Sequence, residues 1–249
     1  MTAQLGSELL KLRTTRATAA LVLWLVGLVL LVVLLHVLSF GSDDLSRRDN
    51  QLRIAGLGTT VAALFGSLLG ATSITGEIRH GTIRPTFLAT PRRGRVIAAK
   101  VVASVLAGLA LGLLAAALTA GVETIGLASR GVGVDITAAE YAQLIAGGAL
   151  AAGLFAAIGV GLGAIVRGQA ATVVGLCVWL LFIEPILLGD LPDAGRFGPG
   201  ASAGAIAGAT QSQLAGDLVA PALGVVVLAA YAAAASVAGS IATTRRDVS

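Results

Sequence analysis

Six long segments without charge constrain this chain more than any other feature of its sequence. Five of them contain no Asp, Glu, Lys or Arg, and the other contains only Glu184. A helix that crosses the ~30 Å hydrocarbon core of a membrane needs about 20 apolar residues. The segments reach that length and are therefore predicted to be membrane-spanning helices: 17–42, 54–76, 101–122, 141–166, 168–189 and 218–244.

The composition excludes a soluble globular protein. Of 249 residues, 56% are hydrophobic and only 12% are charged, and the mean hydropathy is +0.92. Polar side chains this scarce cannot cover a water-facing surface. The Leu, Ala and Val runs lack the two-residue alternation of a membrane barrel strand, so backbone hydrogen bonding in lipid favours helices. We expect an all-α polytopic membrane protein with a single transmembrane domain over residues 1–249, whose first segment is a retained span rather than a signal peptide.

The distribution of basic residues predicts that both termini are cytoplasmic. Positively charged loops remain in the cytoplasm. With the N-terminus inside, twelve of the 17 Lys and Arg residues are cytoplasmic, and the others are Arg47, Arg48, Arg53, Arg130 and Arg196. The isoelectric point near 10.0 then reflects topology and anionic lipid headgroups, and no aromatic-basic module for nucleic acid is present. We expect a multi-pass protein of the cytoplasmic (inner) membrane.

Three segments outside the spans carry further expectations. Residues 1–16 suit an interfacial amphipathic helix along the inner leaflet. Residues 77–100 form a basic cytoplasmic loop, which suits either a short surface helix broken by Gly81 and Pro85 or a loop that only fixes topology. Residues 190–217 are expected to dip into the membrane as a re-entrant segment or to cap its outer face.

Four stretches carry a family resemblance. They are ELLKLRTTR (8–16), RGQAATVVGLCVWLLFIEPIL (167–187), FGPGASAGAIAG (197–208), and an inner-loop pattern of Glu77, Gly81, Thr82, Pro91, Arg92 and Lys100. Together they resemble the permease subunit of ABC-2 type transporters, the prokaryotic exporters related to drug-resistance efflux pumps. The resemblance covers essentially the whole chain, and Arg84 with Pro85 departs from the smoother apolar helix usual in the family.

The resemblance implies a division of labour between two kinds of subunit. This chain would form half of the substrate pathway, pair with a second permease copy or a related permease, and be driven by a dimer of separate ABC ATPase subunits. ATP and Mg²⁺ would bind to the ATPase, because neither Lys11 nor Lys100 follows a glycine as a P-loop lysine does. Alternating access would be driven through the inner loop. The implied coupling residues are Glu77, Gly81, Thr82, Arg84, Phe87, Pro91 and Arg92.

The resemblance also places the second and fifth spans at the dimer axis, beside the substrate. The implied pathway or gate residues are Thr59, Thr60, Phe65, Ser67, Trp179, Phe182 and Glu184. Glu184 precedes Pro185 near the outer boundary, and it fits either a charge that reaches water or part of an outer gate or cation-binding site. The expected substrate is a hydrophobic or amphipathic drug, lipid or peptide.

Three glycine pairs at four-residue spacing predict close helix crossings. Small residues at this spacing let two helix backbones approach each other in a membrane. The pairs are assigned to packing: Gly66 and Gly70, Gly108 and Gly112, and Gly159 and Gly163.

Rival functions have weaker support. Residues 200–204 match the G-x-S-x-G elbow of serine hydrolases around Ser202, and His36 is predicted near the same surface, but the elbow needs a preceding strand. A secondary transporter would need paired ionisable residues at mid-membrane and an inverted repeat, which the sequence does not show. No metal site is expected, because His36 and His80 fall on opposite sides and Cys177 stands alone.

Overall fold

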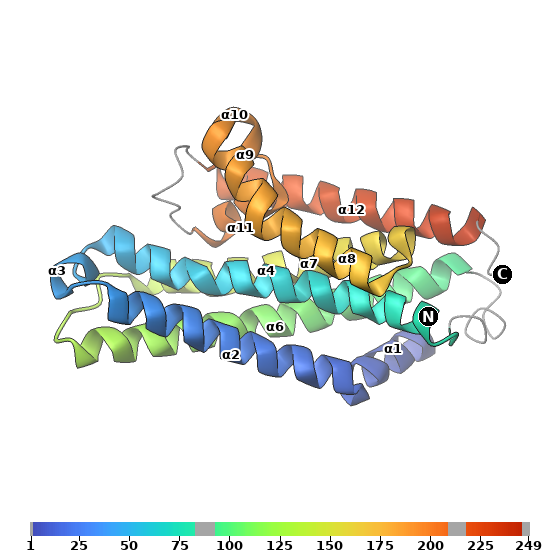
Figure 1. The fold of residues 1–249 in the computed structure, drawn as a ribbon, viewed down its shortest axis with the longest axis horizontal. Helices are drawn as coiled ribbons and strands as arrows, with labels where there is room; N and C mark the ends of the chain where they lie inside the picture. Colours follow the sequence, from blue (N-terminus) through green and yellow to red (C-terminus); the bar gives the residue numbers. More distant parts are fainter. Residues whose placement is uncertain (1, 83–92, 209–217, 246–249) are drawn as a thin grey trace.

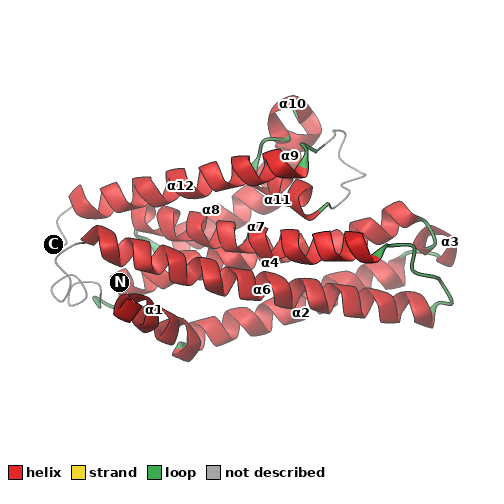
Figure 2. Cartoon of the chain, turned by 180° about the vertical axis from the view of Figure 1, so that it is seen from behind, coloured by secondary structure: helices red, strands yellow, loops and turns green. Residues whose placement is uncertain are grey.

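The computed structural model describes residues 2–82, 93–208 and 218–245, and these residues form helices and no strand (Figures 1 and 2). Six helices among them are long and apolar enough to cross a membrane. They are α2 (Arg16–Ser39), α4 (Arg48–Arg79), α6 (Arg93–Ser129), α7 (Ala138–Val166), the interrupted span Gln169–Asp190, and α12 (Pro221–Arg245). The expected all-α architecture with six potential spans is confirmed.

Shorter helices precede, connect and interrupt these spans. Before α4 lie α1 (Thr2–Thr14) and α3 (Ser42–Leu45). The fifth span consists of α8 (Gln169–Val178), the π-helical turn η1 (Trp179–Ile183) and α9 (Glu184–Asp190), and two short helices follow it, α10 (Pro192–Gly195) and α11 (Pro199–Ala207). The last turn of α12 lies at the same end of the bundle as α1, as an even number of crossings requires (Figure 1).

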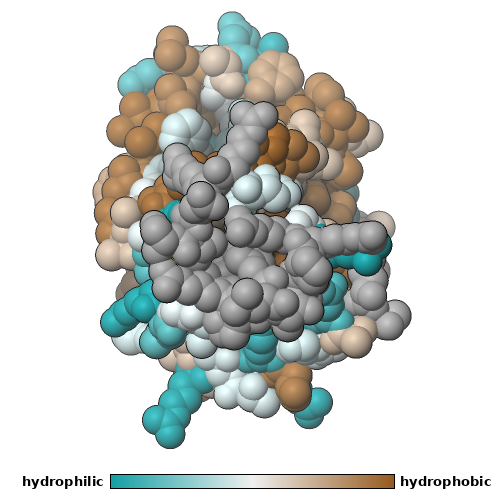
Figure 3. Space-filling view, turned by 90° about the vertical axis from the view of Figure 1, so that its right-hand side faces the viewer, coloured by the Kyte–Doolittle hydropathy of each residue, from teal (hydrophilic) through white to brown (hydrophobic). Residues whose placement is uncertain are grey.

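Helices α4 and α7 form the interior of the bundle. Helix α7 packs against α4, α6 and α12, and α4 also contacts α2 and α8. In the most apolar stretch of each span, 83% of α4 and 72% of α7 are buried, compared with 22% of α2 and 17% of α12. The outer helices expose large apolar side chains, such as Leu23 and Trp24 on α2. Seen from the end that carries α1, hydrophobic residues cover both upper flanks, and hydrophilic residues lie over the lower part and at the top edge (Figure 3). Lipid or another membrane subunit must cover these apolar flanks.

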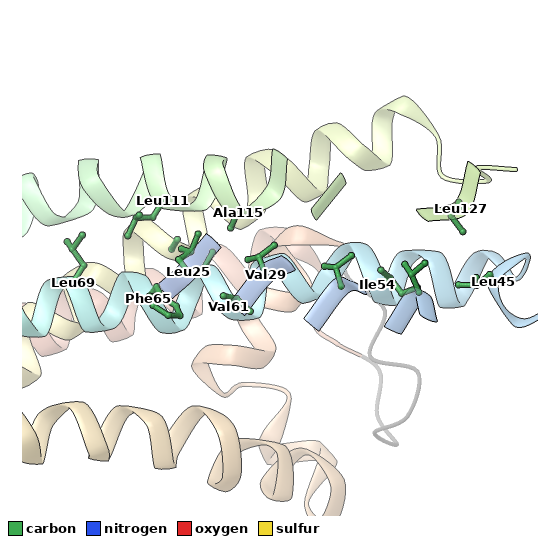
Figure 4. Close-up of a cluster of buried hydrophobic side chains, with 14 residues drawn as sticks. Leu25, Val29, Leu45, Ile54, Val61, Phe65, Leu69, Leu111, Ala115 and Leu127 are labelled. Atoms are coloured by element: carbon green, nitrogen blue, oxygen red, sulfur yellow. The ribbon is translucent and has the colours of Figure 1, made fainter. Parts of the chain in front are cut away.

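The largest apolar cluster joins α2, α4 and α6 (Figure 4). Leu25 and Val29 of α2 point toward Val61 and Phe65 of α4, and Leu111 of α6 completes the contact. Each of these side chains is at most 8% exposed. This cluster attaches the first span to the α4–α6–α7 core.

The predicted glycine pairs lie where α7 crosses α4 and α6. A Cβ atom on Gly70 would collide with the backbone oxygen of Ala156, and one on Gly159 would collide with that of Ser67. On α6, a Cβ on Gly112 would lie 2.5 Å from the Cα of Ala149. Members of all three pairs therefore touch another helix backbone, which confirms their assignment to packing.

Several helices extend beyond the charge-free segments that predicted them. Helix α4 begins at Arg48 rather than at residue 54, and α6 covers Arg93–Ser129 rather than 101–122. The charge-free run marks only the part that suits hydrocarbon, whereas a helix continues into the headgroup region, where charged side chains reach water. The connection predicted at 77–100 is correspondingly shorter, because Glu77 belongs to the last turn of α4.

A proline interrupts the fifth span. Pro185 has no N–H to donate to the carbonyl of Leu181, four residues earlier, and its ring crowds that carbonyl. The chain adopts the π-helical turn η1 at this point, and α9 starts at Glu184. The interruption sets the position from which Glu184 reaches α11.

In its described part, the predicted outer segment has one helix inside the bundle, α11, whereas α10 packs against α9 and projects from the bundle (Figure 1). Helix α11 packs against α4, α7 and α12, and eight of its nine residues are buried. At ~1.5 Å per residue it is too short to cross a membrane. Its burial favours the re-entrant alternative over a surface cap, while residues 209–217 lie outside the described part of the chain.

Candidate functional site

Four charged side chains meet at the end of the bundle that carries α1. The Nζ of Lys100 lies 2.5 Å from Oε2 of Glu8 and 3.1 Å from Oε1 of Glu77, and it donates to the backbone oxygen of Ser73. The Nζ of Lys11 lies 2.7 Å from Oε1 of Glu8 and 2.8 Å from Oε1 of Glu77. We call Glu8, Lys11, Glu77 and Lys100 the inner ionic cluster.

Three helices supply the inner ionic cluster. Glu8 and Lys11 are three residues apart on α1 and therefore share one helix face, Glu77 lies in the last turn of α4, and Lys100 lies near the start of α6. The side chain of Lys100 is only 2% exposed and that of Glu8 only 8%. Two positive and two negative groups balance in charge, which makes burial of the group tolerable.

The ionised forms of the two α1 residues are stabilised by their neighbours. Burial alone would raise the pKa of Glu8, but the charge and hydrogen bond of Lys100, with those of Lys11, lower it below its usual value. Burial would likewise lower the pKa of Lys11, but its hydrogen bonds to Glu77 and Glu8 raise it. Oε2 of Glu77 is buried and accepts no hydrogen bond from the described residues. The four charged groups are therefore paired with one another, and Oε2 of Glu77 is the cluster oxygen that has no partner among the described residues.

The structure describes three of the expected coupling residues. Glu77 faces Lys11 and Lys100 of its own chain rather than pointing outward. Gly81 has a φ of +70° and ends α4, and the Thr82 hydroxyl lies 3.4 Å from the backbone oxygen of Glu77. The other four expected coupling residues lie outside the described residues: Arg84, Phe87, Pro91 and Arg92.

A cavity of about 610 Å³ opens beside the inner ionic cluster. All four cluster residues line it, together with Thr82 and other polar residues of α2, α4 and α8. Movement of the turn at Thr82 would therefore act on a hollow, charged region rather than on a packed apolar core. Such a region is easier to deform than a close-packed interior.

A second polar site surrounds Glu184. Its side chain bends toward α11, where Oε1 accepts hydrogen bonds from the backbone N–H groups of Gly200 and Ala201, the latter at 2.9 Å. Glu184 is 4% exposed, and its Oε2 has no hydrogen-bond partner among the described residues. The carboxyl group thus caps the N-terminus of α11, where free N–H groups and the helix dipole favour negative charge.

Glycines make room for this carboxyl group. A Cβ on Gly198 would collide with Oε1 of Glu184, and one on Gly200 would lie 3.0 Å from the carboxyl carbon. The Gly198-Pro199-Gly200 sequence therefore fits the acid as well as starting α11. This contact gives a structural role to glycines of the stretch 197–208, which the sequence analysis noted only for its family resemblance.

The expected pathway residues do not form a single surface. Thr59 and Thr60 line a cavity of about 120 Å³ with Glu184. Phe65 lies in the apolar cluster against α2, and Ser67 is fully buried with its hydroxyl donating to the backbone oxygen of Leu64.

The two expected aromatic residues of the fifth span do not line this small cavity, although the Trp179 side chain lies beside the Glu184 carboxyl group. Trp179 lines a separate apolar cavity of about 450 Å³ with residues of α7, α8 and α12. Phe182 is 62% exposed on the flank of the bundle. The structure thus brings Glu184 together with the two threonines and separates Phe65, Ser67 and Phe182 from them.

The residues of the rival hydrolase hypothesis lie in helices. Ser202 lies in α11, is fully buried, and its hydroxyl has no partner among the described residues. His36 lies in α2, where Nδ1 contacts the backbone oxygen of Val32. The residues before α11 form turns rather than the strand that a nucleophile elbow requires.

Sequence reasoning missed one buried acid. Glu123 falls just beyond the charge-free segment 101–122, yet it lies within α6 and is fully buried. Neither carboxyl oxygen has a hydrogen-bond partner among the described residues, although the Tyr141 side chain lies beside it. Within the described ranges, no group of three or more His, Cys, Asp or Glu residues could hold a metal ion.

Comparisons with known proteins add no family assignment. A scan against protein-family models finds no match, and a search of curated protein sequences finds none either. The functional argument therefore depends on the residues and geometry described above.

Proposed function

We propose that this chain is the membrane-spanning permease subunit of an ATP-binding cassette exporter of the ABC-2 type. Two permease subunits would form the pathway in the cytoplasmic membrane, with both termini inside. A separate ATPase dimer would bind ATP and Mg²⁺ and drive the transport of a hydrophobic or amphipathic molecule. Six potential spans and the exposed apolar flanks support such an assembly, because half a pathway must pair with another membrane subunit.

The inner ionic cluster is the observation that carries the proposal. It joins α1, the end of α4 and the start of α6 at one point. The turn at Gly81 and Thr82 follows Glu77 directly in the sequence. A force on this turn therefore reaches three helices through short ion pairs, as an ATPase-driven permease needs.

In this proposal Glu77 acts inside the bundle and does not contact the ATPase directly. Because Lys11 and Lys100 hold its carboxyl group, Glu77 transmits movement of the turn into the bundle. We assign contact with the ATPase to the turn at Gly81 and Thr82 and to the basic residues that follow it in the sequence. Gly81 suits such contact, since no atom of the described residues lies within 4 Å of the position of a Cβ there.

Co-purification tests this proposal directly. The tagged protein is extracted from its native membrane, and co-purifying proteins are identified by mass spectrometry and assayed for ATP hydrolysis. We expect a stoichiometric ATPase whose activity and coupling to transport fall in a Gly81→Trp variant. Gly131→Trp is the matched control, because Gly131 has a φ of +69° and equally open surroundings in the α6–α7 connection. Purification without an ATPase, or equal loss in both variants, would reject the proposal.

A further inference from the structure

No positively charged side chain lines the cavity at Glu184 among the described residues. The acid itself is 4% exposed. Two N–H groups of α11 favour the ionised carboxylate, whereas burial in an apolar span opposes it. Oε2 has no hydrogen-bond partner among the described residues, and the uncharged indole of Trp179 lies beside the carboxyl group, so a cation from outside the chain would supply the positive charge that these residues do not.

The cavity that Glu184 lines has room for a small organic cation. Its volume of about 120 Å³ equals the space of roughly four water molecules at ~30 Å³ each. Leucines line much of the wall, and Thr60 supplies a hydroxyl group near the exposed rim. An alkylammonium group bound there would place its charge beside the Glu184 side chain, a second N–H toward Thr60, and its carbon chain against Leu64, Leu180 and Leu188.

We propose that this cavity binds the alkylammonium group of a transported molecule, with Glu184 as its counter-ion. That the bound molecule is transported rests on the proposed exporter function, whereas the cation site does not depend on that function. An amphipathic amine is then the substrate class. The amine enters the charged cavity, while the rest of the molecule lies along the apolar surface of the fifth span.

The chain contains a reporter for this site. Its two tryptophans are Trp24, which is 72% exposed on α2, and Trp179, whose side chain lies beside the Glu184 carboxyl group. A Trp24→Phe protein therefore reports on Trp179 alone. Purified in detergent, it is titrated with propylammonium chloride while its fluorescence is followed. 1-Propanol serves as the neutral probe of matched size, and sodium chloride as the ionic-strength control.

We expect saturable binding of propylammonium and none of 1-propanol. Glu184→Gln should weaken binding at least tenfold, because Gln keeps an oxygen for the N–H groups of Gly200 and Ala201 but loses the charge. Glu123→Gln should leave the affinity unchanged, since Glu123 is a buried acid of another span that does not line this cavity. Equal binding of both probes, or unchanged affinity in Glu184→Gln, would overturn the proposal.

A second variant covers the case in which Glu184→Gln does not fold. Thr60→Val removes the rim hydroxyl with little change of shape and should weaken propylammonium binding severalfold, so wild-type affinity in this variant counts against the site. The titration uses no ATPase. If propylammonium binds but no ATPase co-purifies, the cation site stands and the exporter function is rejected. If an ATPase co-purifies but propylammonium does not bind, the exporter function stands and the cation site is rejected.

Discussion

The Nζ of Lys100 lies 2.5 Å from Oε2 of Glu8, although the two residues are 92 positions apart. Lys100 is only 2% exposed, so loss of Glu8 would leave its charge largely buried. This pair fixes the N-terminal helix α1 to the start of α6. Helix α1 is therefore attached to the bundle by a buried ion pair.

Removing Lys100 should destabilise the protein strongly. Lys100→Met leaves Glu8 and Glu77 buried with fewer cationic partners, and breaking a buried pair in this way costs about 3–5 kcal/mol. Lys11→Met is the control, because Lys11 is 42% exposed and a pair at that exposure is worth about 1 kcal/mol or less. Denaturant unfolding in mixed micelles measures both. Glu8→Gln added to Lys100→Met should restore part of the loss, and simple additivity of the two changes would contradict the pairing.

The inner ionic cluster should also limit the pH range of stability. The pKa of Glu8 lies below its unfolded value of 4.5, so its contribution is present above that pH and is lost as pH falls through the folded pKa. The pKa of Lys11 lies above 10.5, so its contribution is complete below that pH and is lost as pH rises through the folded pKa. Thermal unfolding across pH should show a plateau between these limits. Glu8→Gln should remove much of the decline on the acid side, and an identical acid profile in both proteins would exclude Glu8 as its cause.

Local sequence features account for most of the architecture. Charge-free length marks the six spans, glycine spacing marks the crossings of α7, and Pro185 marks the interruption of the fifth span. Each of these features acts through the backbone of its own helix, so one sequence is enough to recognise it.

The pairing of charges across helices could not be predicted in the same way. Glu8, Glu77 and Lys100 each look like an ordinary interfacial charge, and only tertiary packing shows that they share partners. Glu184 left two alternatives open, and the close contact with Gly198 and Gly200 shows that it points inward. The burial of Glu123 was hidden because α6 continues beyond its charge-free run.

Close contact between α4 and α7 should make Gly70 intolerant of a methyl group. A Cβ there meets the backbone oxygen of Ala156, which cannot rotate away, and overpacking of this kind costs about 1–3 kcal/mol. Gly27→Ala is the matched control, because Gly27 is also within a helix and has nothing within 4 Å of a Cβ. Alanine at this position should leave the free energy of unfolding unchanged or raise it by up to about 1 kcal/mol, since alanine has a higher helix propensity than glycine. Unfolding in mixed micelles compares the two, and equal stability of both variants would show that the crossing is less tight.

Cysteine labelling should place α1 and α3 on opposite sides of the membrane. Cys177 is the only cysteine, so Cys177→Ser gives a background without thiols. Ser7 of α1 and Asp43 of α3 are both exposed, and a full span, α2, separates them. If the basic residues set the orientation as expected, a membrane-impermeant maleimide should label Asp43→Cys in intact cells and Ser7→Cys only after permeabilisation. The reverse pattern would put the inner ionic cluster outside the cell, where no ATPase could act on it, and would refute both the topology and the proposed coupling.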